Sequence, residues 1–154
     1  MDLQDLVAPE GVVAHLKVSS KKQALQELSA RAAEVTGLSE RHIFETLLER
    51  ERLGSTGVGQ GIAIPHGKLA EATRLYGLFA RVDTPIDFDS IDDRPVDLIF
   101  LLLAPETAGA DHLKALARIS RLLRNPSIVE KLRGTEDNAA LYALLTEPSA
   151  TTAA

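Results

Sequence analysis

The chain has 154 residues, 45% of them hydrophobic and 25% charged, with a formal net charge of -5 at pH 7. This length and composition are typical of one globular domain with a sizeable core. The acidic balance argues against a nucleic-acid-binding surface, and the absence of cysteine excludes disulfides, thiolate metal sites and cysteine nucleophiles.

No segment of the sequence has the pattern of a secretory signal or a membrane span. The first six residues, Met1 to Leu6, carry acids and no basic residue, unlike the start of a secretory signal. The longest strictly apolar run covers residues 98–104 and is far shorter than a membrane helix. We therefore expect a cytoplasmic protein with no membrane insertion.

Four elements are predicted in the first third of the chain. They are a helical turn, a strand and two helices, over residues 2–8, 12–16, 20–37 and 39–53. The run Pro9-Glu10-Gly11 is expected to end the first helical turn. Ser20 and Gln23 have the spacing of a capping box, and Gly37 favours the end of that helix. In the next helix, Glu51 is expected to face outward or to flank the apolar stripe.

Strands come first in the rest of the chain, and helices follow. The predicted strands cover residues 62–64, 75–82 and 96–103, and the predicted helices cover about 110–123, 126–134 and 137–145. Pro65 is expected to end the first of these strands, and Leu113 to face inward from the first of these helices. The nearly continuous apolar run at residues 98–103 is typical of a central strand covered by helices on both faces.

Helices therefore alternate with strands early in the chain and cluster late. This order predicts the α/β class, with a single domain built on a mixed, about five-stranded β-sheet flanked by helices on both faces. The domain is predicted to span residues 1–146, and residues 147–154 are predicted to form a flexible C-terminal tail.

A glycine-rich stretch covers residues 54–68, with the sequence Gly-Ser-Thr-Gly-Val-Gly-Gln-Gly-Ile-Ala-Ile-Pro-His-Gly-Lys. Glycines let backbone N–H groups approach a bound anion closely. A nucleotide P-loop does not fit, because five residues separate Gly61 from Gly67 and Leu69 stands where Ser or Thr is needed. The dinucleotide fingerprint does not fit either, because the glycine spacing differs and a helix precedes the stretch.

His66 stands between Pro65 and Gly67, where its side chain is held in one direction and the neighbouring backbone is open. Chemistry alone leaves two readings, a turn histidine without a role or a nucleophile that accepts a phosphoryl group. The nucleophile needs a neutral imidazole and donors for the phosphoryl oxygens. The candidate donors are Arg50, His112, Ser55, Thr56 and the backbone N–H groups of glycines such as Gly57 and Gly59. For Arg50, an exposed ion pair with Glu49 is the alternative.

The sequence does not predict a metal site or a bound cofactor. Its four histidines include no pair at the i, i+4 spacing of a helical zinc site. A metal held between His66 and His112 is the remaining alternative, and His15 and His42 are expected to be ordinary polar residues. We therefore expect no cofactor and no metal.

The segment from Arg50 to Lys68 resembles the active-site stretch of the fructose/mannitol-type enzyme IIA domains of the bacterial phosphotransferase system. Its Gly-Ser-Thr-Gly and Ile-Pro-His-Gly-Lys motifs are most similar to the nitrogen-regulatory branch of that family. Three further motifs, at residues 84–89, 94–100 and 111–113, agree with that branch in order and spacing. The resemblance covers about residues 2–146.

This resemblance implies a phosphotransferase that works through a phosphohistidine intermediate. His66 corresponds to the phosphoacceptor, with Nε2 as the accepting atom, and Arg50 and His112 correspond to its active-site partners. A small histidine-phosphocarrier protein would be the donor, and phosphorylation would regulate target proteins such as sensor kinases or ion transporters. One alternative is a sugar-uptake IIA subunit that passes phosphate to an enzyme IIB. Another is a binding module whose glycine cradle holds a small anion.

Overall fold

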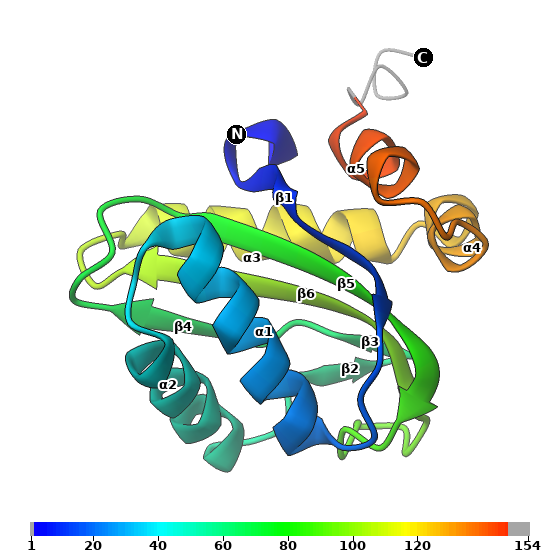
Figure 1. Cartoon of the computed structure of the whole chain (residues 1–154), viewed down its shortest axis with the longest axis horizontal. Helices are drawn as coiled ribbons and strands as arrows, with labels where there is room; N and C mark the ends of the chain where they lie inside the picture. The colour runs from blue at the N-terminus through cyan, green and yellow to red at the C-terminus, as the bar shows by residue number, and fades with distance from the viewer. Residues whose placement is uncertain (1, 148–154) are drawn as a thin grey trace.

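A six-stranded mixed sheet lies at the centre of the protein in the computed structural model, which describes residues 2–147 (Figure 1). The strand order is β1-β5-β6-β3-β2, and β4 pairs with β6 beyond the end of β3. The strands are β1 (Val7–Leu16), β2 (Gly57–Gly59), β3 (Ile62–Ala63), β4 (His66–Leu69), β5 (Tyr76–Ile86) and β6 (Val96–Pro105). Since β5 runs antiparallel to β6 while β3 and β4 run parallel to it, the predicted mixed sheet is confirmed.

Helices cover both faces of this sheet, as predicted. In Figure 1, α1 (Lys21–Thr36) and α2 (Glu40–Arg52) lie in front of it, and α3 (Ala110–Leu123) lies behind. The short helices α4 (Pro126–Arg133) and α5 (Asn138–Thr146) follow α3, and a 3-10 turn (Leu3–Asp5) precedes β1. None of the helices within residues 2–147 is long and apolar enough to cross a membrane.

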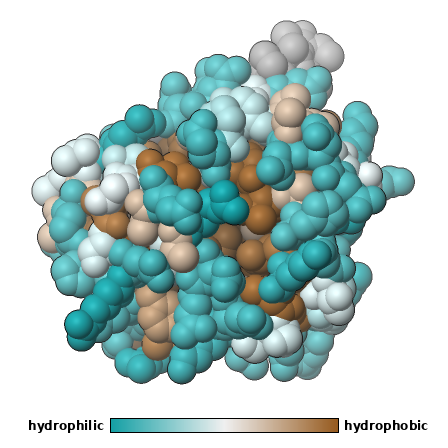
Figure 2. Space-filling view, in the orientation of Figure 1, coloured by the Kyte–Doolittle hydropathy of each residue, from teal (hydrophilic) through white to brown (hydrophobic). Residues whose placement is uncertain are grey.

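The central strand β6 divides the core into two layers. The odd-numbered residues from Ile99 to Leu103 join the apolar cluster beneath α1 and α2, and the even-numbered residues from Leu98 to Leu102 join the cluster beneath α3, α4 and α5. All are fully buried, which is why the sequence is apolar at successive positions instead of alternating. On the face seen in Figure 2, hydrophilic residues cover most of the surface, and hydrophobic residues gather in a band near its middle.

The first strand is longer than its sequence indicates. β1 begins at Val7 and continues through Pro9-Glu10-Gly11, whereas the sequence predicted a helical turn up to residue 8 and a strand only from residue 12. It is an edge strand that pairs only with β5, and its register shifts between Val7 and Val12. A proline at such a position removes no ladder hydrogen bond that a second neighbour would need. The predicted end of the helical turn and the predicted start of the strand are therefore wrong.

Two predictions about helices need correction in detail. The Ser20 hydroxyl accepts the N–H of Gln23, as in a capping box, but the Gln23 side chain returns to the N–H of Ser19 instead of Ser20. Leu113 is 69% exposed, so its predicted inward position is wrong. The buried positions of α3 begin one residue earlier and recur at three- and four-residue spacing; they are His112, Ala115, Ile119 and Leu123. The predicted tail at 147–154 lies outside the described residues except for Glu147.

Candidate functional site

The main chain on both sides of His66 is fixed to the central strand. Pro65 accepts a hydrogen bond from the N–H of Leu102 at 3.0 Å, and His66 itself pairs with Leu102 in the β4–β6 ladder. The chain therefore does not leave the sheet at Pro65, as the sequence suggested, but resumes pairing one residue later. This accounts for the sixth strand and gives the imidazole a rigid support.

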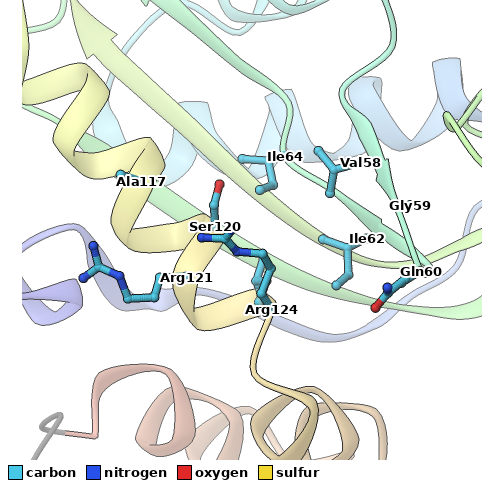
Figure 3. Close-up of a pocket in the computed structure, with 10 residues that line it drawn as sticks. Val58, Gly59, Gln60, Ile62, Ile64, Ala117, Ser120, Arg121 and Arg124 are labelled. Atoms are coloured by element: carbon cyan, nitrogen blue, oxygen red, sulfur yellow. The ribbon is translucent and has the colours of Figure 1, made fainter. Parts of the chain in front are cut away.

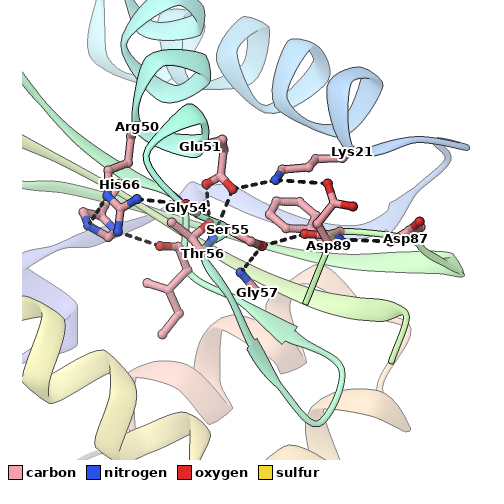
Figure 4. A network of polar contacts seen from close by, with 12 residues as sticks. Lys21, Arg50, Glu51, Gly54, Ser55, Thr56, Gly57, His66, Asp87 and Asp89 are labelled. Carbon is pink, nitrogen blue, oxygen red and sulfur yellow. Dashed lines mark hydrogen bonds and ion pairs between the residues drawn. The ribbon is translucent and has the colours of Figure 1, made fainter. Parts of the chain in front are cut away.

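Gly67 brings helix α2 close to this support. A Cβ atom at Gly67 would lie 2.6 Å from Cγ2 of Thr46, so any other residue there would force the Thr46 side chain or the helix to shift. Arg50 follows Thr46 by one helical turn and therefore lies on the same face of α2. The close packing permitted by glycine thus places the Arg50 guanidinium beside the ring of His66 (Figure 4).

Hydrogen bonds assign different roles to the two ring nitrogens of His66. Nδ1 lies 2.8 Å from the carbonyl oxygen of Ile64, and because a carbonyl can only accept, Nδ1 carries the proton. Nε2 then has a free lone pair, which accepts a long hydrogen bond of 3.4 Å from Nε of Arg50. The same guanidinium donates from Nη1 to the carbonyl of Gly54 at 2.9 Å, so two contacts hold it.

His112 brings a second imidazole to the same place from the first turn of α3. The ring centroids of His66 and His112 are 5.6 Å apart, and the rings meet edge to face at 66°. His112 is only 8% exposed, and its Nε2 is buried without a hydrogen-bond partner. A buried polar atom without a protein partner is unusual, and it leaves Nε2 of His112 available to a group that is not part of the protein.

Burial favours the neutral form of both rings. The pKa of His66 is lowered chiefly by desolvation and also by the Arg50 charge, and the Ile64 hydrogen bond and Glu51 offset part of this effect. The pKa of His112 is lowered by desolvation and by the charges of His66 and Lys68. His66 is therefore a neutral imidazole at pH 7, as a nitrogen nucleophile must be.

These lowered pKa values predict that stability falls on mild acidification. At pH values between the lowered pKa values of the folded protein and the ordinary value of about 6.5, the unfolded chain binds more protons than the folded one. The free energy of unfolding therefore rises with pH through that window, and it levels off above it. Urea unfolding between pH 5 and 8 measures this dependence. The variant with His66→Gln and His112→Gln should have a flatter profile, and an equally steep one would contradict the assignment.

The four predicted cradle residues lie between α2 and β3; they are Ser55, Thr56, Gly57 and Gly59. The hydroxyl of Ser55 donates to the carbonyl of Phe88 at 2.6 Å and accepts the N–H of Gly57 at 3.0 Å. Gly59 is part of β2, where it pairs with Ile62. The Ser55 hydroxyl and the Gly57 N–H are thus engaged within the protein, and the structure does not turn them toward His66 as free donors.

Thr56 is engaged in the same way, by a residue that the sequence did not reveal. Its N–H donates to Glu51 at 3.0 Å, and its hydroxyl donates to the other carboxylate oxygen of Glu51. The same carboxylate lies 2.8 Å from Nζ of Lys21 at the start of α1 (Figure 4). Glu51 is 8% exposed, so the expectation that it faces outward or flanks the stripe is wrong. Three donors compensate its burial and tie α1, α2 and the loop together.

The remaining histidines lie outside this cluster. His15 and His42 are exposed and contact Asp83 and Glu71, at 2.8 and 2.9 Å respectively. Within residues 2–147, no group of three or more His, Cys, Asp or Glu side chains is arranged to hold a metal ion. The structure thus brings together three predicted site residues, His66, Arg50 and His112, on elements far apart in the sequence.

The family model described as "Phosphoenolpyruvate-dependent sugar phosphotransferase system, EIIA 2" matches residues 5–147. The chain belongs to this family of phosphotransfer domains. It is 63% identical over 153 residues to a nitrogen regulatory protein of Bradyrhizobium diazoefficiens, covering 99% of this chain and 100% of the relative. The resemblance to fructose/mannitol-type IIA domains, and to their nitrogen-regulatory branch in particular, is therefore confirmed.

Solved structures give the same result for the fold. The nitrogen regulatory protein IIA-Ntr from Neisseria meningitidis superposes with a TM-score of 0.88 at 38% identity, covering 94% of this chain and 99% of that one. The mannitol IIA in a complex with phosphorylated enzyme IIB from Escherichia coli gives a TM-score of 0.76 at 20% identity, covering 91% and 98%. At 20% identity, the likeness to the mannitol IIA shows the fold alone.

Proposed function

We propose that this protein accepts a phosphoryl group on Nε2 of His66 from a histidine-phosphocarrier protein, and that its phosphorylation state regulates target proteins. The observation that carries the proposal is the hydrogen bond from Nδ1 of His66 to Ile64, which leaves Nε2 free beside Arg50. The family supports phosphoryl transfer, and the Bradyrhizobium relative, by its name, supports a regulatory role. We further propose that the protein acts in the cytoplasm and needs no cofactor.

The transfer step exchanges one phosphorus–nitrogen bond for another. The lone pair on Nε2 of His66 attacks phosphorus while the bond to the donor imidazole breaks, and its electron pair stays on the donor nitrogen. A positive ring charge passes from donor to acceptor, so no net proton is taken up. Catalysis then consists of positioning and charge stabilisation. Arg50 would contact the phosphoryl oxygens, and so would His112 if its Nε2 carries a proton.

Exposed apolar side chains beside the site fit the docking of a protein donor. Leu53 follows the Arg50 turn and is 81% exposed, and Leu113 adjoins His112 and is 69% exposed. Exposed leucines next to a reactive group would supply apolar contacts to a protein that docks there. The proposal therefore places the phosphocarrier over the His66 and His112 rings.

Replacing Leu113 by serine tests this docking surface. The KM for the phosphorylated carrier is expected to rise about tenfold at unchanged kcat, because apolar contact is lost without a change at the reacting atoms. Steady-state transfer measured over a range of carrier concentrations gives both constants. Ala143→Ser, at an exposed position of α5, is the matched control and should leave both unchanged. An unaltered KM in the Leu113 variant would remove this surface from the docking site.

The proposed function is tested by incubating the protein with phosphoenolpyruvate and the upstream carriers. Intact-mass spectrometry should show an acid-labile adduct of about 80 Da, as expected for phosphoryl addition. NMR of the imidazole nitrogens should locate it on Nε2 of His66. An unmodified mass, with a carrier that is itself phosphorylated, would contradict the proposal and favour the binding module.

The second candidate function is a sugar-uptake IIA subunit. The observation that favours it is the matching family model, whose description is that of a sugar phosphotransferase system. Both functions would use His66. Adding a IIB domain to the phosphorylated protein distinguishes them, because a sugar relay should discharge within seconds to minutes and a regulator should keep its phosphoryl group.

A further inference from the structure

A cavity of about 370 Å³ lies between the β2–β3 hairpin and the C-terminal half of α3 (Figure 3). Its volume is in the range of small-molecule sites. Figure 3 shows Ile62 and Ile64 on the strand side and Ser120 and Arg124 on the helix side, whereas Arg121 extends away from the strands. The cavity adjoins the segment that carries His66 but is not lined by His66, Arg50 or His112.

The inner wall of the cavity is apolar. Ile62, Ile64 and Leu123 line it, and each is otherwise covered by the core, with 3 to 4% of its surface exposed. Val58 stands at the edge and is 56% exposed. Such a wall removes an apolar ligand body from water, and this gain is proportional to the area covered.

The charged side chains that line the cavity are both arginines, and the carboxylate of Asp92 lies next to its rim, where it accepts the N–H of Gln60 at 2.9 Å. Arg121 and Arg124 contribute to its lining, and no aspartate or glutamate does, although the whole chain carries a net charge of -5. Within residues 2–147, the guanidinium of Arg124 makes no ion pair or side-chain hydrogen bond, in contrast to Arg133, which binds Asp97 at 2.9 Å. An unpaired guanidinium beside an apolar wall is suited to an anion.

We propose that this cavity binds a small organic anion, with its apolar body against Ile62 and Ile64 and its carboxylate, sulfonate or phosphate on Arg124 and Ser120. The proposal goes beyond phosphoryl transfer and does not depend on it. Ile64 links the two sites, because its side chain lines the cavity while its carbonyl accepts the hydrogen bond from Nδ1 of His66. Binding is therefore detectable at His66 as well.

Two fluorescent probes of nearly the same shape test the proposal. Anilinonaphthalenesulfonate carries one negative charge, and phenylnaphthylamine is the same ring system without it. The anionic probe is expected to bind the full chain at least about tenfold more tightly, since a charge-assisted hydrogen bond contributes that much. Methyl NMR should locate both probes at Ile62 and Ile64, with a smaller change in the His66 ring signals.

Variants then separate the charge from the apolar wall. Arg124→Gln should remove the preference for the anionic probe while phenylnaphthylamine still binds. Arg41→Gln, at an exposed arginine of α2, should leave the preference unchanged. Ala117→Trp should fill the cavity and abolish binding of both probes. The proposal is overturned if the two probes bind the natural chain equally, if Arg124→Gln keeps the preference, or if the methyl shifts fall at Leu53 and Leu113 instead.

Discussion

Replacing His66 by alanine is expected to lower phosphoryl incorporation by at least about 10⁴-fold, because the attacking nitrogen is removed and the site has no substitute for it. His112 is the nearest alternative nucleophile, but its Nε2 is buried, and a buried atom cannot meet a donor protein without movement of α3. Intact-mass spectrometry after incubation with the phosphorylated carrier measures the effect. The fold should persist, since His66 packs at the edge of the core.

His112→Ala is the informative comparison for this experiment. It should still accept one phosphoryl group on His66, but more slowly, because only the stabilisation of the transferring group is lost. Incorporation into the His66 variant at the natural rate would overturn the assignment of the acceptor. A natural rate in the His112 variant would remove only the proposed role of the second ring.

Replacing Glu51 by alanine is expected to lower the free energy of unfolding by about 3 kcal/mol, the cost typical of removing one partner of a buried ion pair. The substitution leaves both donors of Thr56 without their acceptor, and Lys21 keeps only the exposed carboxylate of Asp89, at 3.7 Å. Urea unfolding at pH 7 measures the loss. Lys21→Met, which removes the charge on the other side, should reduce the penalty in a double variant, because the ammonium that has lost its buried partner is then absent.

Glu49→Ala provides the control on the same helix. Glu49 pairs with Arg52 at 2.9 Å, but both side chains are more than half exposed, and such pairs contribute less than about 1 kcal/mol. Equal losses in the Glu49 and Glu51 variants would contradict the structural role assigned to Glu51. The Glu51 variant should also transfer phosphate more slowly, since the loop that it holds contains Gly54, the acceptor for Arg50.

Much of the fold is encoded locally and was predictable. The apolar run of β6 requires cover on both faces, and Ser39, Asn125 and Gly37 mark helix boundaries that the structure confirms. The path of β1 through Pro9 was not predictable in this way. It depends on β1 being the edge strand, which is a property of the assembled sheet.

The candidate site likewise contains some features that the sequence predicts and others that only the folded structure shows. His66 is recognisable because proline and glycine on either side restrict it, whereas the inward turn of Glu51 depends on Lys21 and Thr56 meeting it from other elements. The occupied hydroxyl of Ser55 likewise depends on Phe88, 33 residues away. Local patterns identify groups with chemical potential, and only the assembled structure shows which of those groups already have partners.

The attachment of His66 to β6 limits how phosphorylation can change the protein. Hydrogen bonds and strand pairing hold its backbone against a fully buried strand, so a phosphoryl group on Nε2 has little freedom to rearrange the sheet. We therefore expect the two forms of the protein to share one backbone and to differ in surface potential, because the phosphoryl oxygens add negative charge at the site. A partner would then recognise an electrostatic patch between two leucines, and its preference should weaken as salt concentration rises.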